Sequence, residues 1–216
     1  MPRTVTTYVC QNCGAQSRQF FGRCSSCGSW NSLVEQSSGP PPDGRRRRQS
    51  APAAEPTPRR SEAMAAVGER AVQRLGTGFA ELDRVLGGGL VPGSLVLVGG
   101  DPGIGKSTLL LQTAADLAQR QSVLYVSAEE SAQQVKLRWQ RLAAAGGGGD
   151  GPQLLAETDL EHVLQELEAL RPDVAVIDSI QALHDADLSS APGSVAQVRE
   201  CAASLQRLAK KLDIAL

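Results

Sequence analysis

The sequence predicts a two-part protein: an α/β domain built on a mostly parallel sheet, preceded by a small module that a metal ion holds together. Three observations predict this organisation. A glycine-rich loop lies between an apolar segment and a helical segment, further apolar and helical segments alternate after it, and four cysteines near the amino terminus form two C-x-x-C pairs. Alternating strand and helix patterns are typical of parallel α/β sheets.

The glycine-rich loop begins at Gly100 and matches G-x-x-x-x-G-K-[ST], the phosphate-binding P-loop. The apolar run 95–98 before it predicts a buried parallel strand, and a helix is expected after it. Glycines let the backbone aim successive N–H groups at one anion, and the helix N-terminus adds partial positive charge. A glycine-rich loop without a ligand is the alternative. The expected nucleotide-binding residues are Gly100, Asp101, Pro102, Gly103, Ile104, Gly105, Lys106, Ser107 and Thr108.

Two side chains of this loop have the chemistry of phosphoryl transfer. Lys106 can reach the β- and γ-phosphates of a nucleotide, and the hydroxyl of Ser107 can hold Mg²⁺. Lys106 is therefore expected to take part in catalysis as well as in binding, and the expected cofactors are ATP and Mg²⁺.

The four cysteines are Cys10, Cys13, Cys24 and Cys27, and ten residues separate the two pairs. A glycine follows the second cysteine of each pair, where a tight turn needs a permissive backbone. Four thiolates at this spacing suit tetrahedral, structural Zn²⁺, whereas a redox role would need only one pair. The module has little core, so metal binding must supply its folding free energy, about 10–16 kcal/mol in comparable peptides.

Three aromatic residues of the cysteine module are expected to pack against its turns: Phe20, Phe21 and Trp30. Stacking on a nucleic-acid base or on a protein partner is the alternative use of these rings.

Composition and charge restrict the remaining possibilities. The chain has 216 residues, which allows one α/β domain and something small, and its net charge of −1 gives no argument for nucleic acid. No apolar run approaches the roughly 18 residues that a membrane span needs, and the first residues lack the apolar stretch of a secretion signal. We therefore expect a cytoplasmic protein with no membrane partner, whose cysteines are metal ligands or thiols.

Three regions are expected along the chain: a zinc ribbon at residues 1–35, a disordered Pro/Arg-rich linker at 36–65, and an α/β domain at 66–216. The linker contains six prolines among few apolar residues and the arginine run 45–48. That run is either part of a solvated tether or a contact for nucleic-acid phosphate.

Periodicity predicts the elements of the α/β domain. Helices are expected at 77–86, 107–119, 131–145, 160–170 and 195–212, and strands at 123–126, 154–155, 174–178 and 214–216. Cys201, in the last helix, is expected to be a buried free thiol.

Two of the predicted strands end in carboxylates. Asp178 ends the apolar run V-A-V-I-D, which behind a P-loop is the Walker B pattern of a Mg²⁺ ligand. Glu129 and Glu130 follow the strand at 123–126, at the edge of a parallel sheet where ligands bind. Either could orient or deprotonate the water that attacks the γ-phosphate, although acids are also common at helix N-termini.

Two stretches give a family resemblance. T-G-F-A-E-L-D-R-V-L-G-G-G-L-V-P-G-S and G-G-D-P-G-I-G-K-S-T-L-L-L-Q resemble the signature of RecA/KaiC-type ATPases. With the four-cysteine module in front, the chain is similar to the bacterial DNA repair members of that family. The resemblance implies a RecA-like P-loop NTPase fold and places the catalytic glutamate at Glu129, with Glu130 as the alternative.

The same resemblance implies a function and partners. The implied function is that of a DNA-dependent, Mg²⁺-dependent ATP hydrolase that processes or branch-migrates recombination intermediates. The implied partners are DNA and further copies of the chain, in a homo-oligomer that is a hexameric ring. The loop Asp185–Gly193 is expected to face DNA in that ring, although Asp185 and Asp187 are acidic. The alternatives are a zinc-dependent interaction module with a nucleotide-binding switch, and a KaiC-like phosphotransferase.

The last expected strand contains only three residues, fewer than the five or six of a typical strand. We therefore expect these 216 residues to be part of a longer protein that by themselves bind zinc, turn over ATP slowly and form no stable ring.

Overall fold

The computed structural model describes residues 6–37, 61, 63–66, 73–143 and 150–216. The arginine run at 45–48 and the glycine run at 146–149 lie outside the described residues, so the expectations for them stay predictions. A single 3-10 turn, Met64–Ala66, lies between the two folded parts of the chain.

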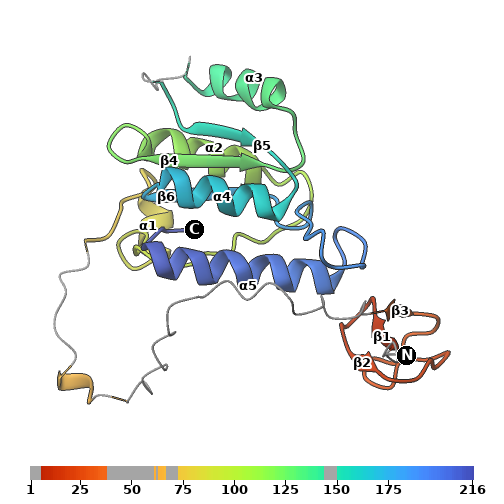
Figure 1. The fold of residues 1–216 in the computed structure, drawn as a ribbon. Helices are drawn as coiled ribbons and strands as arrows, with labels where there is room; N and C mark the ends of the chain where they lie inside the picture. Colours follow the sequence, from red (N-terminus) through yellow and green to blue (C-terminus); the bar gives the residue numbers. More distant parts are fainter. Residues whose placement is uncertain (1–5, 38–60, 62, 67–72, 144–149) are drawn as a thin grey trace, which may run out of the picture.

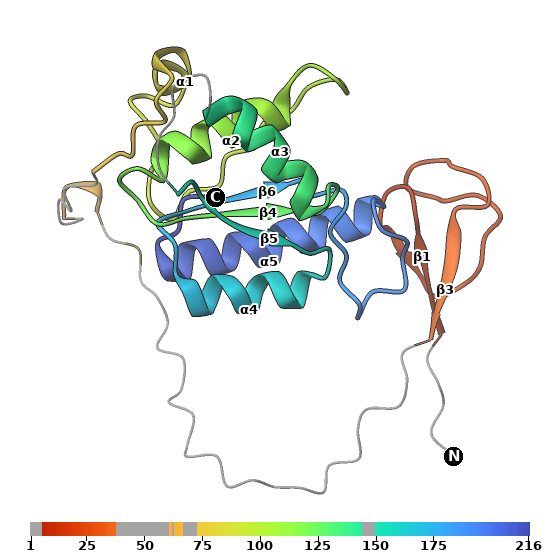
Figure 2. The same ribbon diagram turned by 90° about the horizontal axis from the view of Figure 1, so that it is seen from above.

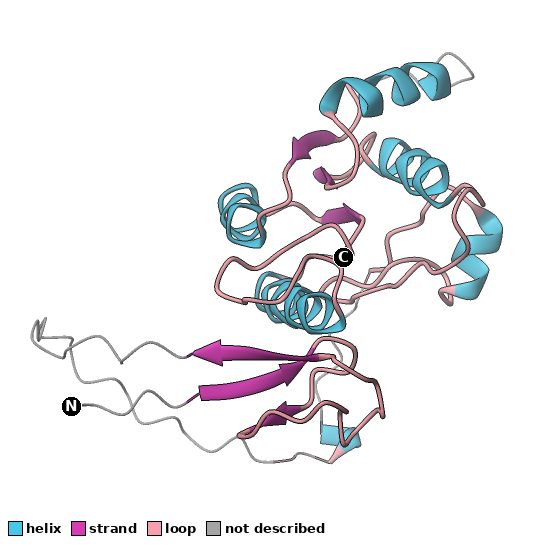
Figure 3. Cartoon of the chain, turned by 90° about the vertical axis from the view of Figure 1, so that its right-hand side faces the viewer, coloured by secondary structure: helices cyan, strands magenta, loops and turns pink. Residues whose placement is uncertain are grey.

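The amino-terminal part is a three-stranded antiparallel sheet in the order β2-β1-β3 (Figure 3). Its strands are β1 at Thr6–Cys10, β2 at Gln16–Ser17 and β3 at Leu33–Ser37. The register sets Cys10 opposite Leu33. The interior consists mainly of Cys10, Cys24 and Leu33, so cysteine side chains provide much of the core of this ribbon.

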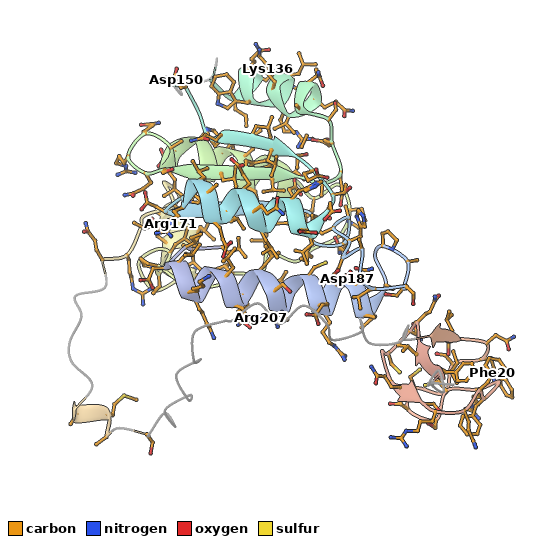
Figure 4. All side chains as sticks on the ribbon, in the orientation of Figure 1. Phe20, Lys136, Asp150, Arg171, Asp187 and Arg207 are labelled. Atoms are coloured by element: carbon orange, nitrogen blue, oxygen red, sulfur yellow. The ribbon has the colours of Figure 1, made fainter. Side chains whose placement is uncertain are left out.

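The three aromatic side chains do not pack inside the ribbon, and the expectation that they would is wrong. Phe20, Phe21 and Trp30 are 58%, 47% and 72% exposed, and Figure 4 shows Phe20 at the outer surface. The physical reason is the size of the module, because an interior formed by cysteines has no room for large rings. Phe20 meets only the edge of Tyr8, and the Arg23 guanidinium lies 5.7 Å from the centre of the Trp30 ring.

The second part contains a parallel sheet with helices on both faces (Figures 1 and 2). Its regular strands are β4 at Val123–Ser127, β5 at Gln153–Ala156 and β6 at Val174–Asp178, in the order β5-β4-β6. Residues 214–216 extend the sheet beside β6, where the N–H of Ala175 donates to the carbonyl of Ala215.

The segment before the P-loop forms the outermost part of this sheet, but as an extended chain and not as a regular strand. Val96 N–H donates to the Leu216 carbonyl, and Leu216 N–H donates to the Ser94 carbonyl. The expectation of a buried strand at 95–98 is therefore wrong: Leu97 is 79% exposed. Among the described residues, the backbone bonds of this segment to Leu216 involve Ser94 and Val96, and Leu97 lies beyond them.

The helices agree with the expected pattern to within a few residues. Helices α2 at Lys106–Leu117 and α3 at Ala132–Ala143 lie on one face of the sheet. The other face is covered by α4 at Leu160–Leu170 and α5 at Val195–Leu212. A short helix, α1 at Ala80–Val85, precedes the sheet and buries none of its own residues. Among the described helices, none has the length and apolar character that crossing a membrane requires.

Two apolar layers hold the helices on the sheet. The layer under α2 includes Leu111, Leu117, Val123, Tyr125 and Val135. The layer under α4 and α5 includes Leu124, Val163, Leu167, Cys201 and Leu205. Cys201 is fully buried and free, so the expected buried free thiol is confirmed, and burial raises the pKa of this thiol to about 11.

The loop after β6 is held by one buried amide, Gln197 in the first turn of α5. Its Oε1 accepts from the Asp185 N–H, and its Nε2 donates to the carbonyls of Asp185, Leu188 and Ser190. Only 1% of Gln197 is exposed. The side chain of Gln197, in the helix that follows, therefore holds the polar loop predicted at 184–193 in place.

Replacing Gln197 by Leu should lower the free energy of unfolding by about 2 kcal/mol or more, because three carbonyls and an N–H lose their partner. The measurement is denaturant unfolding of the 216-residue chain. Gln206→Leu, on the exposed face of the same helix, is the matched control and should change stability little. Equal losses in the two variants would contradict a role for the buried amide.

Candidate nucleotide and metal sites

The P-loop runs directly into α2. Gly103 and Gly105 have φ angles of 80° and 102°, a region that side chains other than glycine rarely occupy. Gly105 is the N-cap of α2 and, being glycine, offers no side chain to the first N–H groups of the helix. These N–H groups therefore remain available to an anion, which is the arrangement that phosphate sites at helix N-termini use.

The Lys106 ammonium contacts the loop itself. Its Nζ donates to the carbonyls of Gly100 and Asp101, at 2.7 and 2.9 Å. The lysine thus lies folded over the concave side of the loop, where its charge is partly balanced by carbonyl dipoles. A phosphate entering the loop offers a stronger, charged acceptor for the same ammonium group.

The carboxyl ends of β4 and β6 lie side by side at one edge of the sheet. Parallel pairing sets Ser127 opposite Asp178, and the Ala128 N–H donates to the Asp178 carbonyl. The Ser127 hydroxyl then donates to the Glu130 carbonyl and accepts from the Glu130 N–H. This turn places both glutamates beside the end of β6. Helix α2 packs on β4 and β6, so its N-terminus belongs to the same edge.

The two glutamates have different partners. Glu130 accepts a 2.6 Å hydrogen bond from Arg138 of α3, and the two side chains are 31% and 22% exposed. Glu129 instead accepts a hydrogen bond from the Ser179 hydroxyl, which follows Asp178. Glu130 is thus neutralised by a fixed cation, while Glu129 lies next to the strand end that carries the predicted Mg²⁺ ligand.

A tyrosine that sequence reasoning missed contacts Asp178. Tyr125 of β4 donates a 2.6 Å hydrogen bond from its hydroxyl to Asp178 Oδ2. Burial raises the pKa of Tyr125, and the bond to Asp178 raises it further. The signal in the sequence was its place two residues before the end of β4, on the face that Asp178 shares in the neighbouring strand.

The four cysteine sulfurs form a compact group that fits the predicted zinc ion. All four lie within 4.8 Å of one another, with Cys10 and Cys27 at 3.7 Å and Cys13 and Cys24 at 3.6 Å. A tetrahedron with Zn–S bonds of about 2.3 Å has edges of about 3.8 Å. The sulfurs are therefore arranged as ligands around one Zn²⁺, and none of them is in a disulfide.

The surroundings of these thiols give them different pKa values. Burial raises the pKa of Cys10, but hydrogen bonds with the Ser32 side chain and with the backbone of Asn12 and Cys13 outweigh it and lower that pKa to about 6. For Cys13 a backbone bond lowers the pKa, but desolvation and the neighbouring sulfurs raise it to about 11. Four adjacent thiolates repel one another, and a central dication removes that cost.

Comparison with protein families agrees with both parts of the structure. A family described as an AAA domain matches residues 57–216, which is most of the chain. The chain belongs to this AAA domain family. A second family, described as a rubredoxin metal binding domain, matches residues 8–35, which contain all four cysteines. The AAA domain and the metal-binding module thus correspond to the sheet-and-helix part and to the ribbon.

The curated relatives that this chain matches are named DNA repair protein RadA. The relative from Listeria monocytogenes is 46% identical over 99% of the chain, and that from Bacillus subtilis is 44% identical over 99%. The relative from Haemophilus influenzae is 45% identical over 98%. The chain spans slightly less than half of the length of these relatives, 45% or 46%.

A solved structure shows the same fold as this AAA domain. The KaiC-like protein PH0186 from Pyrococcus horikoshii aligns with a TM-score of 0.50 over 66% of this chain and 68% of its own. The two sequences are 20% identical, so this likeness concerns the fold alone. The predicted RecA-like core with a parallel sheet, preceded by a zinc ribbon, is confirmed.

Cys24→Ser should release zinc and unfold the ribbon, because three thiolates and a hydroxyl bind Zn²⁺ much more weakly than four thiolates. The measurement is the zinc content of protein purified without chelator, expected at one ion per chain and close to none in the variant. Cys201→Ser, a buried thiol of α5, is the matched control and should keep its zinc. A wild-type chain without zinc would contradict the assignment.

Proposed function

We propose that this chain is the ATP-binding and ATP-hydrolysing part of a DNA repair ATPase, and that its reaction is stimulated by DNA. The observation that carries the proposal is the meeting of three groups at one sheet edge: the uncapped start of α2, Asp178 and Glu129. Identity of about 45% to proteins named DNA repair protein RadA supports the repair role.

The proposed reaction uses each group in a separate role. The N–H groups at residues 103–108 and the Lys106 ammonium bind the β- and γ-phosphates, after the ammonium leaves the carbonyls of Gly100 and Asp101. Ser107 and Asp178 would hold Mg²⁺, which would supply positive charge to offset the charge that develops on the phosphates. Glu129 orients and deprotonates the attacking water.

Glu129 is preferred to Glu130 for this role because of their partners. A general base needs a lone pair free to take a proton, and the hydroxyl of Ser179 can turn away from Glu129 when water enters. The guanidinium of Arg138 already occupies Glu130 in a partly buried ion pair. A structural role in joining α3 to β4 suits Glu130 better.

Two surfaces support DNA as the partner. The exposed rings of Phe20, Phe21 and Trp30 can stack on unpaired bases, and the stacked Arg23 guanidinium adds a cation for phosphate. The loop Asp185–Gly193, fixed by Gln197, is the second proposed contact, through its hydroxyls and backbone N–H groups. Branch migration of recombination intermediates is the proposed biological task.

From the resemblance to RecA-type ATPases, we also propose that the longer protein forms a homo-oligomer, a hexameric ring. We propose that this ring works in the cytoplasm. Light scattering gives the mass of the assembly directly.

The function is tested by phosphate release from radiolabelled ATP, with and without single-stranded DNA. We expect a slow rate for this chain, raised by DNA, and loss of both rate and tight ATP binding in Lys106→Ala, which removes the ammonium from the phosphates. ATP binding with no turnover and no effect of DNA would indicate a nucleotide-binding switch instead. Label transferred to protein hydroxyls would indicate a phosphotransferase.

Glu129→Gln should keep the affinity for ATP while single-turnover hydrolysis falls roughly 10²-fold or more, the usual contribution of a positioned base. Glu130→Gln is the matched comparison. Because it weakens the pair with Arg138, it should lower thermal stability more than the rate. Normal hydrolysis in Glu129→Gln together with lost hydrolysis in Glu130→Gln would assign the base to Glu130.

A further inference from the structure

Tyr125 is the only described side chain that donates a hydrogen bond to the Asp178 carboxylate in this structure. The tyrosine is 1% exposed and lies in the apolar layer under α2, with Leu111 and Val135. Its hydroxyl is the one polar group of that ring, and it reaches the edge of the sheet where the proposed nucleotide site lies. A packing role alone would be met by phenylalanine.

The geometry follows from the strand register. Tyr125 is paired with Val176 in the parallel ladder, and Asp178 lies two residues farther along β6, on the same face. A tyrosine side chain is long enough to cover that diagonal, and the 2.6 Å bond shows that it does. The ring is fixed by its packing, so the donor occupies one position.

The hydroxyl can only act as a donor towards this carboxylate. A phenol hydroxyl has one proton to donate, and it lies 2.6 Å from Asp178 Oδ2, an oxygen that accepts. It binds Oδ2, and no described side chain donates to Oδ1. One oxygen of Asp178 is thus fixed by the protein, and the other is left available to a ligand.

We propose that Tyr125 is a positioning residue for the proposed Mg²⁺–ATP site, holding the Asp178 carboxylate in the orientation that receives the metal. The inference rests on the proposed function, since it needs Asp178 to hold Mg²⁺. Groups that hydrogen-bond to metal-binding carboxylates commonly change metal affinity 10–100-fold when removed. The effect of Tyr125 passes through Asp178, because its hydroxyl is bonded to that carboxylate and its ring is buried.

The experiment is a Mg²⁺ titration of the binding of mant-ATP, a fluorescent ATP analogue, to the 216-residue chain. Tyr125→Phe keeps the ring and removes only the hydroxyl. We expect unchanged mant-ATP affinity in EDTA, where Lys106 and the loop N–H groups bind the phosphates alone. The Mg²⁺ concentration at half-maximal response should rise about tenfold. Tyr8→Phe, the only other tyrosine, is the matched control and should behave as wild type.

A double-mutant cycle with Asp178→Ala separates positioning from packing. If Tyr125 acts through the carboxylate, adding Tyr125→Phe to Asp178→Ala should change the Mg²⁺ dependence no further. If the tyrosine only packs, its effect should persist in that background and should lower affinity in EDTA as well. This comparison holds even where Tyr125→Phe lowers the thermal midpoint.

The outcomes distinguish the inference from the function on which it rests. A wild-type chain whose mant-ATP binding does not respond to Mg²⁺ would overturn the proposed Mg²⁺–ATP site. A wild-type chain that responds, together with a Tyr125→Phe variant that has the same half-maximal concentration, would overturn the positioning role alone.

Discussion

The parallel pairing of β4 with β6 is the interaction on which the proposed site depends. It sets Ser127 opposite Asp178 and brings the ends of two strands to one edge, although the two residues are 51 positions apart in the chain. Helix α2 packs on both strands, so the P-loop at its start belongs to that edge. A slip of one residue in this register would turn the Asp178 side chain to the opposite face. The apolar layers on both faces of the sheet hold the register.

Each acidic side chain at this edge has a partner of different chemistry, and the partners give the acids different properties. Asp178 has a neutral, buried phenol, Glu129 a rotatable hydroxyl, and Glu130 a guanidinium. A neutral donor orients a carboxylate without cancelling its charge, which suits a metal ligand. A cation pairs the charge and makes the acid part of the framework. Three carboxylates within 50 residues of sequence are thereby separated into three proposed roles.

The ribbon depends on a different constraint. Its interior consists mainly of cysteine side chains and Leu33, so the folded state needs the metal that those cysteines bind. Because the cysteines use the interior, the rings of Phe20, Phe21 and Trp30 remain on the surface. The same shortage of core that makes the module depend on zinc thus leaves its aromatic rings exposed.

The sequence by itself determined the features that depend on local pattern and spacing. The P-loop, the two C-x-x-C pairs and the helices at 160–170 and 195–212 follow from residue type and periodicity, and the structure has both helices at those bounds. Only the tertiary structure decided which side chains meet. The contact of Tyr125 with Asp178 joins residues 53 positions apart, and the bond of Ser179 to Glu129 joins residues 50 apart. It also decided burial: Leu97 is exposed although it lies in an apolar run, and the ribbon aromatics are exposed because cysteines fill the interior. Periodicity predicts which face of a helix or strand is apolar, whereas the amount of neighbouring structure determines whether that face is buried.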